Sequence, residues 1–517
     1  MNIIDRRHRS VTLGPIRRGD ARNCWLPVVS GRGIGQRCEC IGPKTVILVH
    51  VTGSGQMSGN DRGNAVDLLI TGPDLVTMDD YGTVIPDGAI AVRGNEISWI
   101  GPMAEADFDA AEVIHRPGSI ACPGLIDSHF HTAQQFLRGV IATDRRSGQL
   151  DLPIWKQYLV PFEAQLSPED VRLSAEIAYA ELMAAGTTCI AEAGGPHPDE
   201  MARAAVDSGI RAFVSRSTAD QGDLPPSMMA STDDNIAQTA LLLDRWPNSE
   251  NARVVAWTSL RQLLVCSDEL SRAMADLAAE NEVRVHTHLC EGSYEIDYAA
   301  AKWRCRPSEH LADIGVFNDR LHSAHAILLS DAEVDLYGEL GASVAHCPMQ
   351  NYVIGPGKTP QLVARGVAVG LGTDGAVFNP VLDLMATARV AGVTAQALHG
   401  TSSHVQSMFG PEQLLSMATG DRARTVGLAG RLGQLTVGCL ADFVIHEVGG
   451  LESIPGVDPV VTLVESLGRN TVETVVVDGV VVLRAREHQL IDVEALVSRA
   501  RSRVPALLAE TGTHPRR

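Results

Sequence analysis

Short stretches of the sequence hold histidines and acidic residues of the types that bind a divalent metal and activate water. They are His129 and His131 in DSHFHT, His286, His288 and Glu291 in VHTHLCE, His325 in HSAHAIL and Asp374 in GTDG. Neutral imidazole and carboxylate suit a borderline divalent ion such as zinc, and such a site keeps an open position for water. A divalent ion makes hydroxide available at neutral pH, so these residues favour metal-assisted hydrolysis.

The spacing in VHTHLCE does not show which of its two histidines binds the metal. Side chains on a strand alternate between its two faces, so His286 and His288 point to the same face. Both could therefore chelate one ion. Alternatively, His288 and Glu291 lie at the strand end and point into a site, with His286 buried one layer below. The stretch alone does not decide between these two arrangements.

The elements that would position these residues alternate between helix and strand. Residues 167–186 are predicted to be a helix: Ser167 is the N-cap, Pro168 takes the first helical position, and Asp170 completes a capping-box-like S-x-x-D. Gly186 is the expected stop signal. A strand, TTCIAEAG, follows directly.

The same helix-then-strand unit recurs along the chain. Its later strands are IRAFVSRS, VRVHTHLCEG, ASVAHCPMQN and VAVGLGTDG. Apolar strands that alternate with amphipathic helices predict a parallel arrangement, and this length fits a (β/α)8 TIM-type barrel over residues 121–425. The carboxyl ends of the strands form the active site of such a barrel. Those ends also carry Glu192, Arg216, His346 and Asn351.

Strand-like segments flank the predicted barrel on both sides. We expect residues 66–120 and 426–490 to form one small composite β-sandwich, and residues 491–517 to form a C-terminal helix and tail. Residues 1–65 hold ten Lys/Arg against four Asp/Glu and show no periodicity. We interpret them as a disordered or non-native leader, with the functional chain starting near Met57; an Arg-rich targeting peptide is the alternative.

The composition indicates which classes of binding partner and which cellular compartment to expect. The net charge of −19 argues against nucleic acid or an anionic membrane, which would call for a basic patch. Apolar runs such as TVILVHV are far shorter than the roughly 20 residues that span a bilayer. The ten cysteines are scattered without C-x-x-C pairs, which is typical of reduced thiols in a cytoplasmic protein. We expect a cytoplasmic enzyme with a small-molecule substrate, and a homo-oligomer (dimer or tetramer).

The motifs together resemble a known family. PGLIDSHFHT, HTHLCE, HSAHAILLSDAEV and GLGTDGAVFNP, in this order, are similar to the amidohydrolase superfamily. They resemble most its chlorohydrolase/deaminase branch, which includes triazine hydrolases, guanine deaminase and adenosine-type deaminases. The resemblance covers roughly residues 66–485.

The resemblance implies a role for each residue of the site. It implies that the metal ligands are His129, His131, His288 and Asp374. Glu291 then acts as the acid/base, His325 lies beside the nucleophilic water and the substrate, and Asp374 also takes the proton of the water. On this interpretation His288, and not His286, binds the metal, and His286 is structural.

The lysines indicate one metal ion. Binuclear members of the superfamily bridge two ions with a carboxylated lysine at the end of a central strand. The chain has only Lys44, Lys156, Lys302 and Lys358, and none closes a predicted strand. We expect one divalent ion per chain, zinc by default, with Fe²⁺, Mn²⁺ and Co²⁺ as alternatives.

The substrate is less defined by sequence. Possible substrate contacts are Gln135, Glu163, Arg216, His346 and Asn351. Relatives that deaminate S-adenosylhomocysteine-like nucleosides carry a Gly-Pro-His-Ser-like stretch after strand 4, whereas this chain has WTSLRQLLVCS, with Arg261 near the place of the histidine. We therefore predict deamination or dehalogenation of an N-heteroaromatic ring. Hydrolysis of an amide-like C–N bond in a urea, carbamate or thiocarbamate is the alternative, and a non-catalytic barrel scaffold is the alternative of another class.

Overall fold

The computed structural model describes residues 3–4, 10–11, 64–142, 151–250 and 252–513. The chain divides into two compact units, Met1–Asn60 and Asp61–Arg517. In the first unit, strands β1 (Ile3–Ile4) and β2 (Ser10–Val11) pair antiparallel. The predicted leader over residues 1–65 lies almost entirely outside the described residues and stays a prediction.

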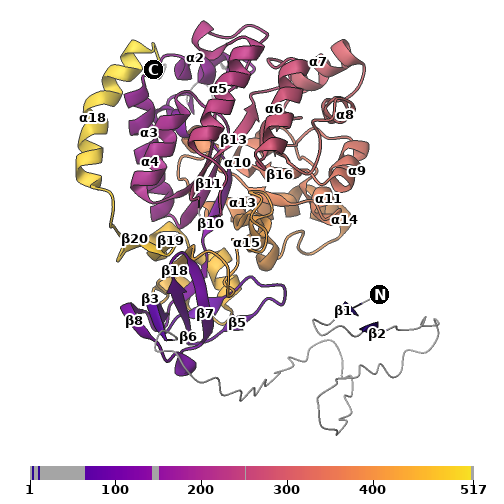
Figure 1. Ribbon diagram of the computed structural model, residues 1–517. Helices are drawn as coiled ribbons and strands as arrows, with labels where there is room; N and C mark the ends of the chain where they lie inside the picture. Colours follow the sequence, from indigo (N-terminus) through magenta and orange to yellow (C-terminus); the bar gives the residue numbers. More distant parts are fainter. Residues whose placement is uncertain (1–2, 5–9, 12–63, 143–150, 251, 514–517) are drawn as a thin grey trace, which may run out of the picture. The chain divides into compact units, whose positions relative to one another are not determined.

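A parallel eight-stranded sheet forms the centre of the second unit (Figure 1). Its strands follow one another in sequence order: β10 (Leu125–Phe130), β11 (Thr187–Glu192), β12 (Arg211–Ser215), β13 (Val254–Leu260), β14 (Val285–Leu289), β15 (Leu321–His325), β16 (Ser343–His346) and β17 (Val369–Leu371). The last strand lies beside the first, and the backbone N–H of Asp374 donates to the carbonyl of His129 at 3.0 Å. The sheet therefore closes on itself, and the predicted TIM-type barrel is confirmed.

Helices connect consecutive strands of the barrel. The main ones are α3 (Pro168–Ala184), α4 (Pro198–Ser208), α5 (Thr232–Arg245), α6 (Asp268–Glu280), α7 (Ser293–Trp303), α8 (Pro307–Asp313), α9 (Asp331–Leu340), α10 (Pro348–Ile354) and α11 (Thr359–Ala364). Two further helices, α13 (Leu384–Ala395) and α15 (Pro411–Ala418), follow the last barrel strand. Ser167 caps α3 through a complete capping box with Asp170, and Gly186 follows the helix with φ of 87°. The stop and start signals predicted for this helix are confirmed.

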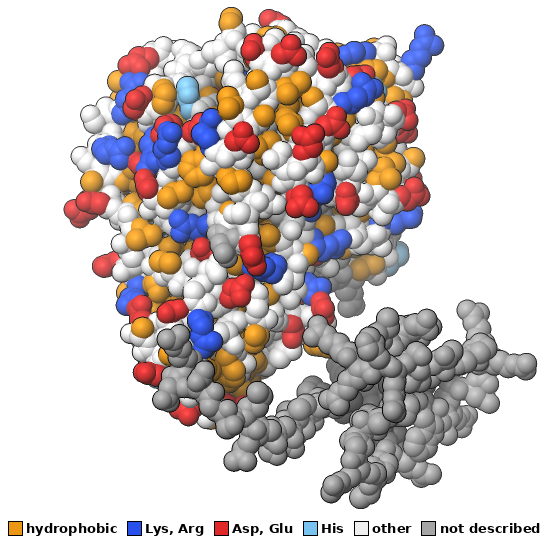
Figure 2. Space-filling model, in the orientation of Figure 1, with side chains coloured by type: hydrophobic (Ala, Val, Ile, Leu, Met, Phe, Trp, Pro, Cys, Tyr) orange, Lys and Arg blue, Asp and Glu red, His pale blue; other side chains and the backbone are white. Residues whose placement is uncertain are grey.

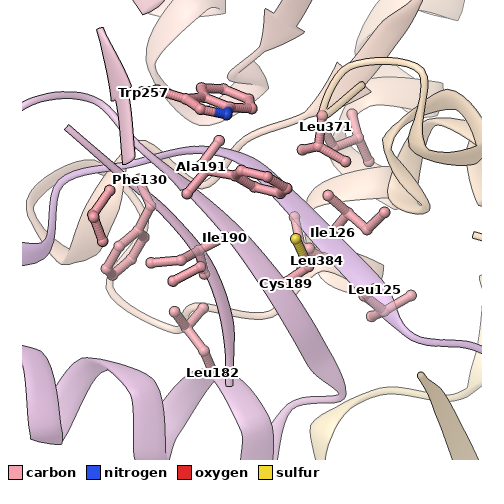
Figure 3. Packing of buried hydrophobic residues seen from close by; sticks show 14 of the residues in the cluster. Leu125, Ile126, Phe130, Leu182, Cys189, Ile190, Ala191, Trp257, Leu371 and Leu384 are labelled. Atoms are coloured by element: carbon pink, nitrogen blue, oxygen red, sulfur yellow. The ribbon is translucent and has the colours of Figure 1, made fainter. Parts of the chain in front are cut away.

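The barrel core is continuous with the layer beneath the helices. Every residue of β11 and β13 is buried, as expected for parallel strands covered on both faces. Figure 3 shows part of this packing, where Leu182 of α3 and Ile190 of β11 belong to one buried cluster. Trp257 of β13 fills the interior against Phe213, with ring centroids 4.6 Å apart.

Two smaller sheets combine segments from both ends of the second unit. One has the order β21 (Glu487–His488), β20 (Val480–Arg484), β19 (Val472–Val477), β18 (Phe443–His446), β9 (Ile120–Pro123), β4 (Asp74–Val76) and β5 (Val84–Ile85); the other has the order β7 (Glu96–Pro102), β6 (Gly88–Arg93), β3 (Ala65–Thr71) and β8 (Asp109–His115). β18 pairs with β9 and β19, so late and early strands share one sheet. Buried residues of both sheets, such as Ile70 and Phe443, pack in one cluster. The composite β-sandwich is therefore confirmed.

A buried ion pair joins the barrel to the composite sheets. Arg211 on β12 donates to both carboxylate oxygens of Asp442 at 2.8 and 2.9 Å and to Asp478 at 2.9 Å. The side chains of Arg211 and Asp442 are 2% and 0% exposed. Removal of either partner would leave an unpaired buried charge, which is strongly destabilising.

The C-terminal helix α18 (Val493–Glu510) lies beside α3 (Figure 1). Arg503 of α18 donates to both carboxylate oxygens of Asp170 at 2.7 and 3.0 Å. The side chain that caps α3 therefore also holds the C-terminal helix. No helix among the described residues is long and apolar enough to cross a membrane. On the face shown in Figure 2, acidic and basic side chains are interspersed.

Candidate active site

Ligand atoms from several strand ends converge at the carboxyl end of the barrel. Nε2 of His288 lies 3.2 Å from Nε2 of His131, and Oδ1 of Asp374 lies 3.2 Å from Nε2 of His129 and 3.5 Å from Nε2 of His131. Zinc–ligand bonds of about 2.0–2.1 Å place tetrahedral ligand atoms about 3.3–3.4 Å apart. These separations fit one metal ion bound by all four residues.

The tautomer of His288 is set by the backbone. Its Nδ1 lies 2.9 Å from the carbonyl oxygen of Arg261. A carbonyl can only accept a hydrogen bond, so Nδ1 carries the proton and Nε2 offers its lone pair to the centre. A histidine that ligates a metal commonly donates its other N–H in this way.

His129 is oriented by a second imidazole. Nδ1 of His286 donates to the carbonyl of Glu192 at 2.9 Å, which leaves Nε2 of His286 as an acceptor. That atom lies 2.9 Å from Nδ1 of His129, so Nδ1 of His129 is the donor. Nε2 of His129 is then unprotonated; it is buried and has no hydrogen-bond partner among the described residues. A buried nitrogen lone pair without a hydrogen-bond partner is expected of a metal ligand.

The electrostatics also favour neutral imidazoles. Burial, together with neighbouring imidazoles, lowers the pKa of His129, His131 and His288 well below the usual value of 6.5; the Arg261 guanidinium adds to the effect on His131 and His288. Metal binding requires unprotonated imidazole, so these rings are ready to bind an ion without first losing a proton.

A buried carboxyl group holds two ligand segments together. Oδ1 of Asp127 accepts the backbone N–H of His129 at 3.3 Å and of Thr373 at 3.0 Å, and Oδ2 accepts the hydroxyl of Thr373 at 2.5 Å. Burial raises the pKa of Asp127 to about 7. The residue ties the end of β10 to the segment that carries Asp374, and so fixes the distance between two ligands.

Glu291 is clamped by one of its two oxygens. Oε2 accepts from Nε2 of Gln262 at 2.8 Å and from the hydroxyl of Tyr294 at 2.9 Å. Nε1 of Trp155 in turn donates to the hydroxyl of Tyr294 at 3.2 Å. Oε1 of Glu291 accepts no hydrogen bond from the described residues. The clamp therefore fixes the carboxylate and leaves one oxygen for a ligand.

Glu291 is also held through its backbone. Its N–H donates to Oε2 of Glu295 on α7 at 3.0 Å. Glu295 is fully buried, and its Oε1 has no partner among the described residues. Burial raises the pKa of Glu295 to about 8, so its carboxyl group is protonated at neutral pH.

His325 is fixed from behind by an amide. Oδ1 of Asn351 accepts from Nδ1 of His325 at 3.0 Å, and Nδ2 of Asn351 donates to the His325 carbonyl at 3.1 Å and to Nδ1 of His346 at 3.0 Å. Nε2 of His325 is therefore the ring atom directed to the centre, where its ring lies 5.2 Å from that of His129. Asn351 and His346 position His325 and do not line the cavity.

Backbone strain accompanies the strand ends. His325, Asp374 and Cys290 have φ values of 73°, 60° and 52°, in the left-handed region that non-glycine residues rarely adopt. Two of these residues belong to the predicted site and the third precedes Glu291. Strain of this kind persists where the surrounding structure enforces it, and it clusters at functional sites.

A cavity of about 360 Å³ opens onto the convergent ligands. Its polar lining residues are His131, Arg261, Gln262, His288, Glu291, Ser293, Tyr294, His325, Gln350 and Asp374, and Gly292 also lines it. Its apolar lining residues are Leu152, Pro153, Ile154, Trp155, Leu159, Val353, Ile354 and Phe378. A cavity that combines an apolar wall with convergent polar groups is typical of a small-molecule site.

None of the five residues predicted to contact the substrate lines this cavity; Asn351 and His346 position His325, and the other three lie elsewhere. Glu163 and Arg216 line a second cavity of about 470 Å³. Oε2 of Glu163 accepts from Nη1 of Arg261 at 2.7 Å. Nε2 of Gln135 donates to Glu181 at 3.1 Å. The structure thus brings together the predicted metal ligands with Glu291 and His325, whereas none of the five predicted substrate contacts lines the cavity.

The sequence does not single out several residues of the cavity. Gln262 follows the noted Arg261, and Tyr294 lies three residues after Glu291, a spacing that brings side chains to one face of a helix turn. That spacing was the available signal for Tyr294. Trp155 lies far away in the chain, and no pattern in the sequence links it to the site.

The lysine argument is consistent with the described part of the chain. Lys156 pairs with the exposed Asp223, and Lys358 pairs with the exposed Asp331. Lys302 lies in α7 beside Tyr298. Among the described residues, the candidate ligand groups share His129 and form one site. Lys44 lies outside the described residues.

Comparisons with known proteins identify the family. The amidohydrolase family model matches residues 120–482. A 5-methylthioadenosine/S-adenosylhomocysteine deaminase of Syntrophobacter fumaroxidans is 30% identical over 440 residues, covering 84% of this chain and 97% of the relative. A 5'-deoxyadenosine deaminase of Methanosarcina mazei is 28% identical over 449 residues, covering 86% and 100%.

Solved structures agree with these relatives. An adenosine deaminase from Xanthomonas campestris with bound zinc matches with a TM-score of 0.79 at 30% identity, covering 86% of this chain and 99% of its own. An atrazine chlorohydrolase from Arthrobacter aurescens complexed with zinc has the same fold, with a TM-score of 0.77 at 24% identity over 85% and 100% of the two chains. The chain therefore belongs to the amidohydrolase family, within its branch of deaminases and chlorohydrolases.

Proposed function

We propose that this protein is a zinc-dependent hydrolase that removes an amino or halogen substituent from a ring carbon of an N-heteroaromatic small molecule. The observation that carries the proposal is the cavity in which His131, His288 and Asp374 face Glu291 and His325. Ligands for a divalent ion, an acid/base with one free oxygen and an oriented imidazole meet there. The names of the deaminase and chlorohydrolase relatives support this reaction class.

The metal would be held by Nε2 of His129, His131 and His288 and by Oδ1 of Asp374. When bound, zinc lowers the pKa of water to about 7 and so supplies a nucleophile at neutral pH. The soft-to-borderline character of three imidazoles with one carboxylate favours zinc over calcium or magnesium. One shared ligand set supports one ion per chain.

Asp374 and Glu291 transfer the protons of the reaction. Asp374 takes a proton from the attacking water, whose oxygen forms the new bond to the ring carbon. Oε1 of Glu291 donates a proton to the neighbouring ring nitrogen, while Gln262 and Tyr294 hold Oε2 in place. The amino group then takes the proton held by Asp374, the carbon–nitrogen bond breaks and ammonia leaves. The new hydroxyl gives its proton to Glu291 and becomes the ring carbonyl, which restores both residues. With a halogen substituent, halide leaves instead.

His325 orients the substrate and the attacking oxygen. Its Nδ1 proton is held by Asn351, so Nε2 is aimed at the centre in a fixed direction. A fixed hydrogen-bonding group requires no reorganisation during the reaction, which is the basis of electrostatic preorganisation. Asn351 and His346 act here as positioning residues.

A substrate screen tests the proposal. Zinc-loaded protein would be incubated with aminopurines, aminopyrimidines, pterins and amino- or chlorotriazines, and release of ammonia or chloride would be followed. We expect turnover in at least one of these ring classes. Turnover of acyclic ureas, carbamates or thiocarbamates with no action on any ring would contradict the proposal, and no bound metal would favour a scaffold.

We further propose a cytoplasmic homo-oligomer built from a leader (1–65), a composite β domain (66–120 with 426–490), the barrel (121–425) and a C-terminal helix and tail (491–517). The described cysteines are all unpaired, which supports a reducing compartment. The mass of the native particle, measured by light scattering, would give the oligomeric state. A monomer at micromolar concentration would contradict the dimer or tetramer.

A further inference from the structure

Two cavities lie on either side of one buried ion pair. Arg261 lines the metal cavity, and Glu163 lines the second cavity. Nη1 of Arg261 lies 2.7 Å from Oε2 of Glu163 and 3.5 Å from the carbonyl of Gly194. The pair therefore forms part of the wall between the cavities.

The wall is fixed. The side chains of Arg261 and Glu163 are 3% and 1% exposed. The second oxygen of Glu163 accepts from Nε2 of Gln134 at 2.6 Å, so both carboxylate oxygens are occupied. Separation of a buried pair leaves an uncompensated charge on each side, which makes spontaneous opening costly.

Glu163 and Arg216, which could bind a ribose and an anionic group attached to it, line the second cavity and not the metal cavity. A carboxylate can accept hydrogen bonds from the hydroxyls of a ribose, but that of Glu163 lines the second cavity and is paired with Arg261. Arg216 could bind an anionic tail, but its guanidinium lies in the second cavity and donates to Gln238. Neither group reaches a ligand in the metal cavity.

The exposed residues of the metal cavity are largely apolar instead, with Ser293 as a polar exception. Leu152, Val353 and Ile354 line it although they are 75%, 64% and 37% exposed. Trp155 and Phe378 continue this apolar surface inward. Exposed apolar side chains grouped at a cavity mark a surface that an apolar ligand covers. Sugar hydroxyls placed against this surface would lose water without gaining partners.

We propose that the substrate is an unglycosylated heteroaromatic ring whose remaining substituents are apolar, and that the Arg261–Glu163 pair excludes nucleosides. This inference rests on the proposed function, since it concerns the same cavity. The ring lies between the metal ligands and Glu291, and its apolar substituents lie against Leu152, Val353 and Ile354. The second cavity stays closed to the substrate.

Matched sets of compounds test the preference. The purine set is adenine, 9-ethyladenine and adenosine; the pyrimidine set is cytosine, 1-ethylcytosine and cytidine; an aminotriazine with and without an N-ethyl group completes the panel. We expect kcat/KM for the ethylated member of the active set to exceed that of the nucleoside by at least about 10²-fold, the range that unpaired polar groups produce. A nucleoside that matches or exceeds its ethylated partner overturns the proposal.

Two variants assign the effect to the structure. R261Q/E163Q removes both charges together and should raise the nucleoside-to-ethyl ratio at least about 10-fold. R245Q/D199N removes an ion pair on the other side of the second cavity and should leave this ratio unchanged. L152S, at an exposed position, should lower kcat/KM for the ethylated ring by about 3- to 10-fold. An unchanged preference in both R261Q/E163Q and L152S overturns the proposal.

Equilibrium binding separates this inference from the proposed reaction. If no ring releases ammonia or chloride, the reaction class is wrong, and calorimetric titration of the zinc-loaded wild-type protein still tests the cavity. Binding of an ethylated ring without binding of its nucleoside supports the inference. Preferential binding of the nucleoside, or binding of none of the rings, overturns it.

Discussion

Nδ1 of His129 donates a hydrogen bond to Nε2 of His286 across 2.9 Å, and His286 is itself anchored to the carbonyl of Glu192. The residue predicted to be structural therefore has a specific task. It fixes the tautomer of a metal ligand although it does not contact the metal centre in the geometry that fits zinc.

His286 and His288 should consequently differ when replaced. His288→Ala removes a ligand, so we expect loss of most bound metal and of activity together. His286→Ala leaves all ligands but frees the ring of His129, and loss of such an outer partner typically weakens metal affinity about 10–100-fold. Competition with a chelator measures both. An emptied site in His286→Ala with full occupancy in His288→Ala would reverse the assignment.

Replacement of Glu291, or of Tyr294 that holds its carboxylate, should lower the catalytic rate without removing the metal. Glu291→Gln should retain the metal and lower kcat about 10²–10⁴-fold, the usual contribution of general acid/base transfer. Tyr294→Phe keeps the carboxylate but removes one donor to Oε2, so we expect a smaller loss of about 10-fold in kcat with KM little changed. Metal analysis and steady-state kinetics test both variants, and loss of metal in Glu291→Gln would contradict the assignment.

Asn351 should act only through His325. Asn351→Leu, which is similar in size, removes the acceptor for Nδ1 of His325, and the ring can then rotate away from the attacking oxygen. We expect kcat to fall about 10²-fold while bound metal stays at one ion per chain. Tyr352, next in the chain, is a suitable control: Tyr352→Phe should retain wild-type kcat. Equal losses in both variants would point to a general disturbance of α10.

Glu295 should make stability depend on pH. Burial raises its pKa from 4.5 to about 8. The folded chain thus binds this proton more tightly than the unfolded chain, and the resulting stability is full below about pH 4.5 and is lost as the pH rises through about 8. Glu295→Gln keeps the shape without this titration. We expect the Tm of the wild type to fall relative to the variant between about pH 5 and pH 8, and parallel curves would contradict this.

Residues 1–56 should contribute nothing to the folded enzyme. They show no periodicity and carry a charge balance opposite to the rest of the chain. We therefore expect a chain that starts at Met57 to match the full-length protein in Tm and in activity. A marked loss in either would show that this segment packs on the barrel.

The fold could be predicted because its signals are local and repeated. Ser167, Asp170 and Gly186 mark the ends of one helix within a short window, and the following units repeat the pattern. One expected strand segment, GQLTVGCLADFVIHEV, forms a strand only at Phe443–His446. Gly433 and Gly438 have φ of 76° and 89° and turn the preceding stretch into a loop.

The candidate site was predictable only in part. Metal ligands follow from residue type at strand ends, since a parallel barrel gathers those ends on one face. Glu163 is different: the sequence predicts it as a substrate contact, yet it pairs with Arg261 and does not line the metal cavity. Contacts between side chains far apart in the chain, such as Trp155 with Tyr294, leave no periodic trace in the sequence.

The composite sheet imposes an order on folding in the cell. β9 lies between β4 and β18, and Asp442, just before β18, receives the guanidinium of Arg211. A ribosome delivers residues from the N-terminus onward, so the early strands emerge long before their partners from residues 443–488. Until synthesis is nearly complete, they present an open sheet edge, which invites pairing with other chains. A nascent chain stalled before Phe443 is thus the state most exposed to aggregation and most dependent on chaperones.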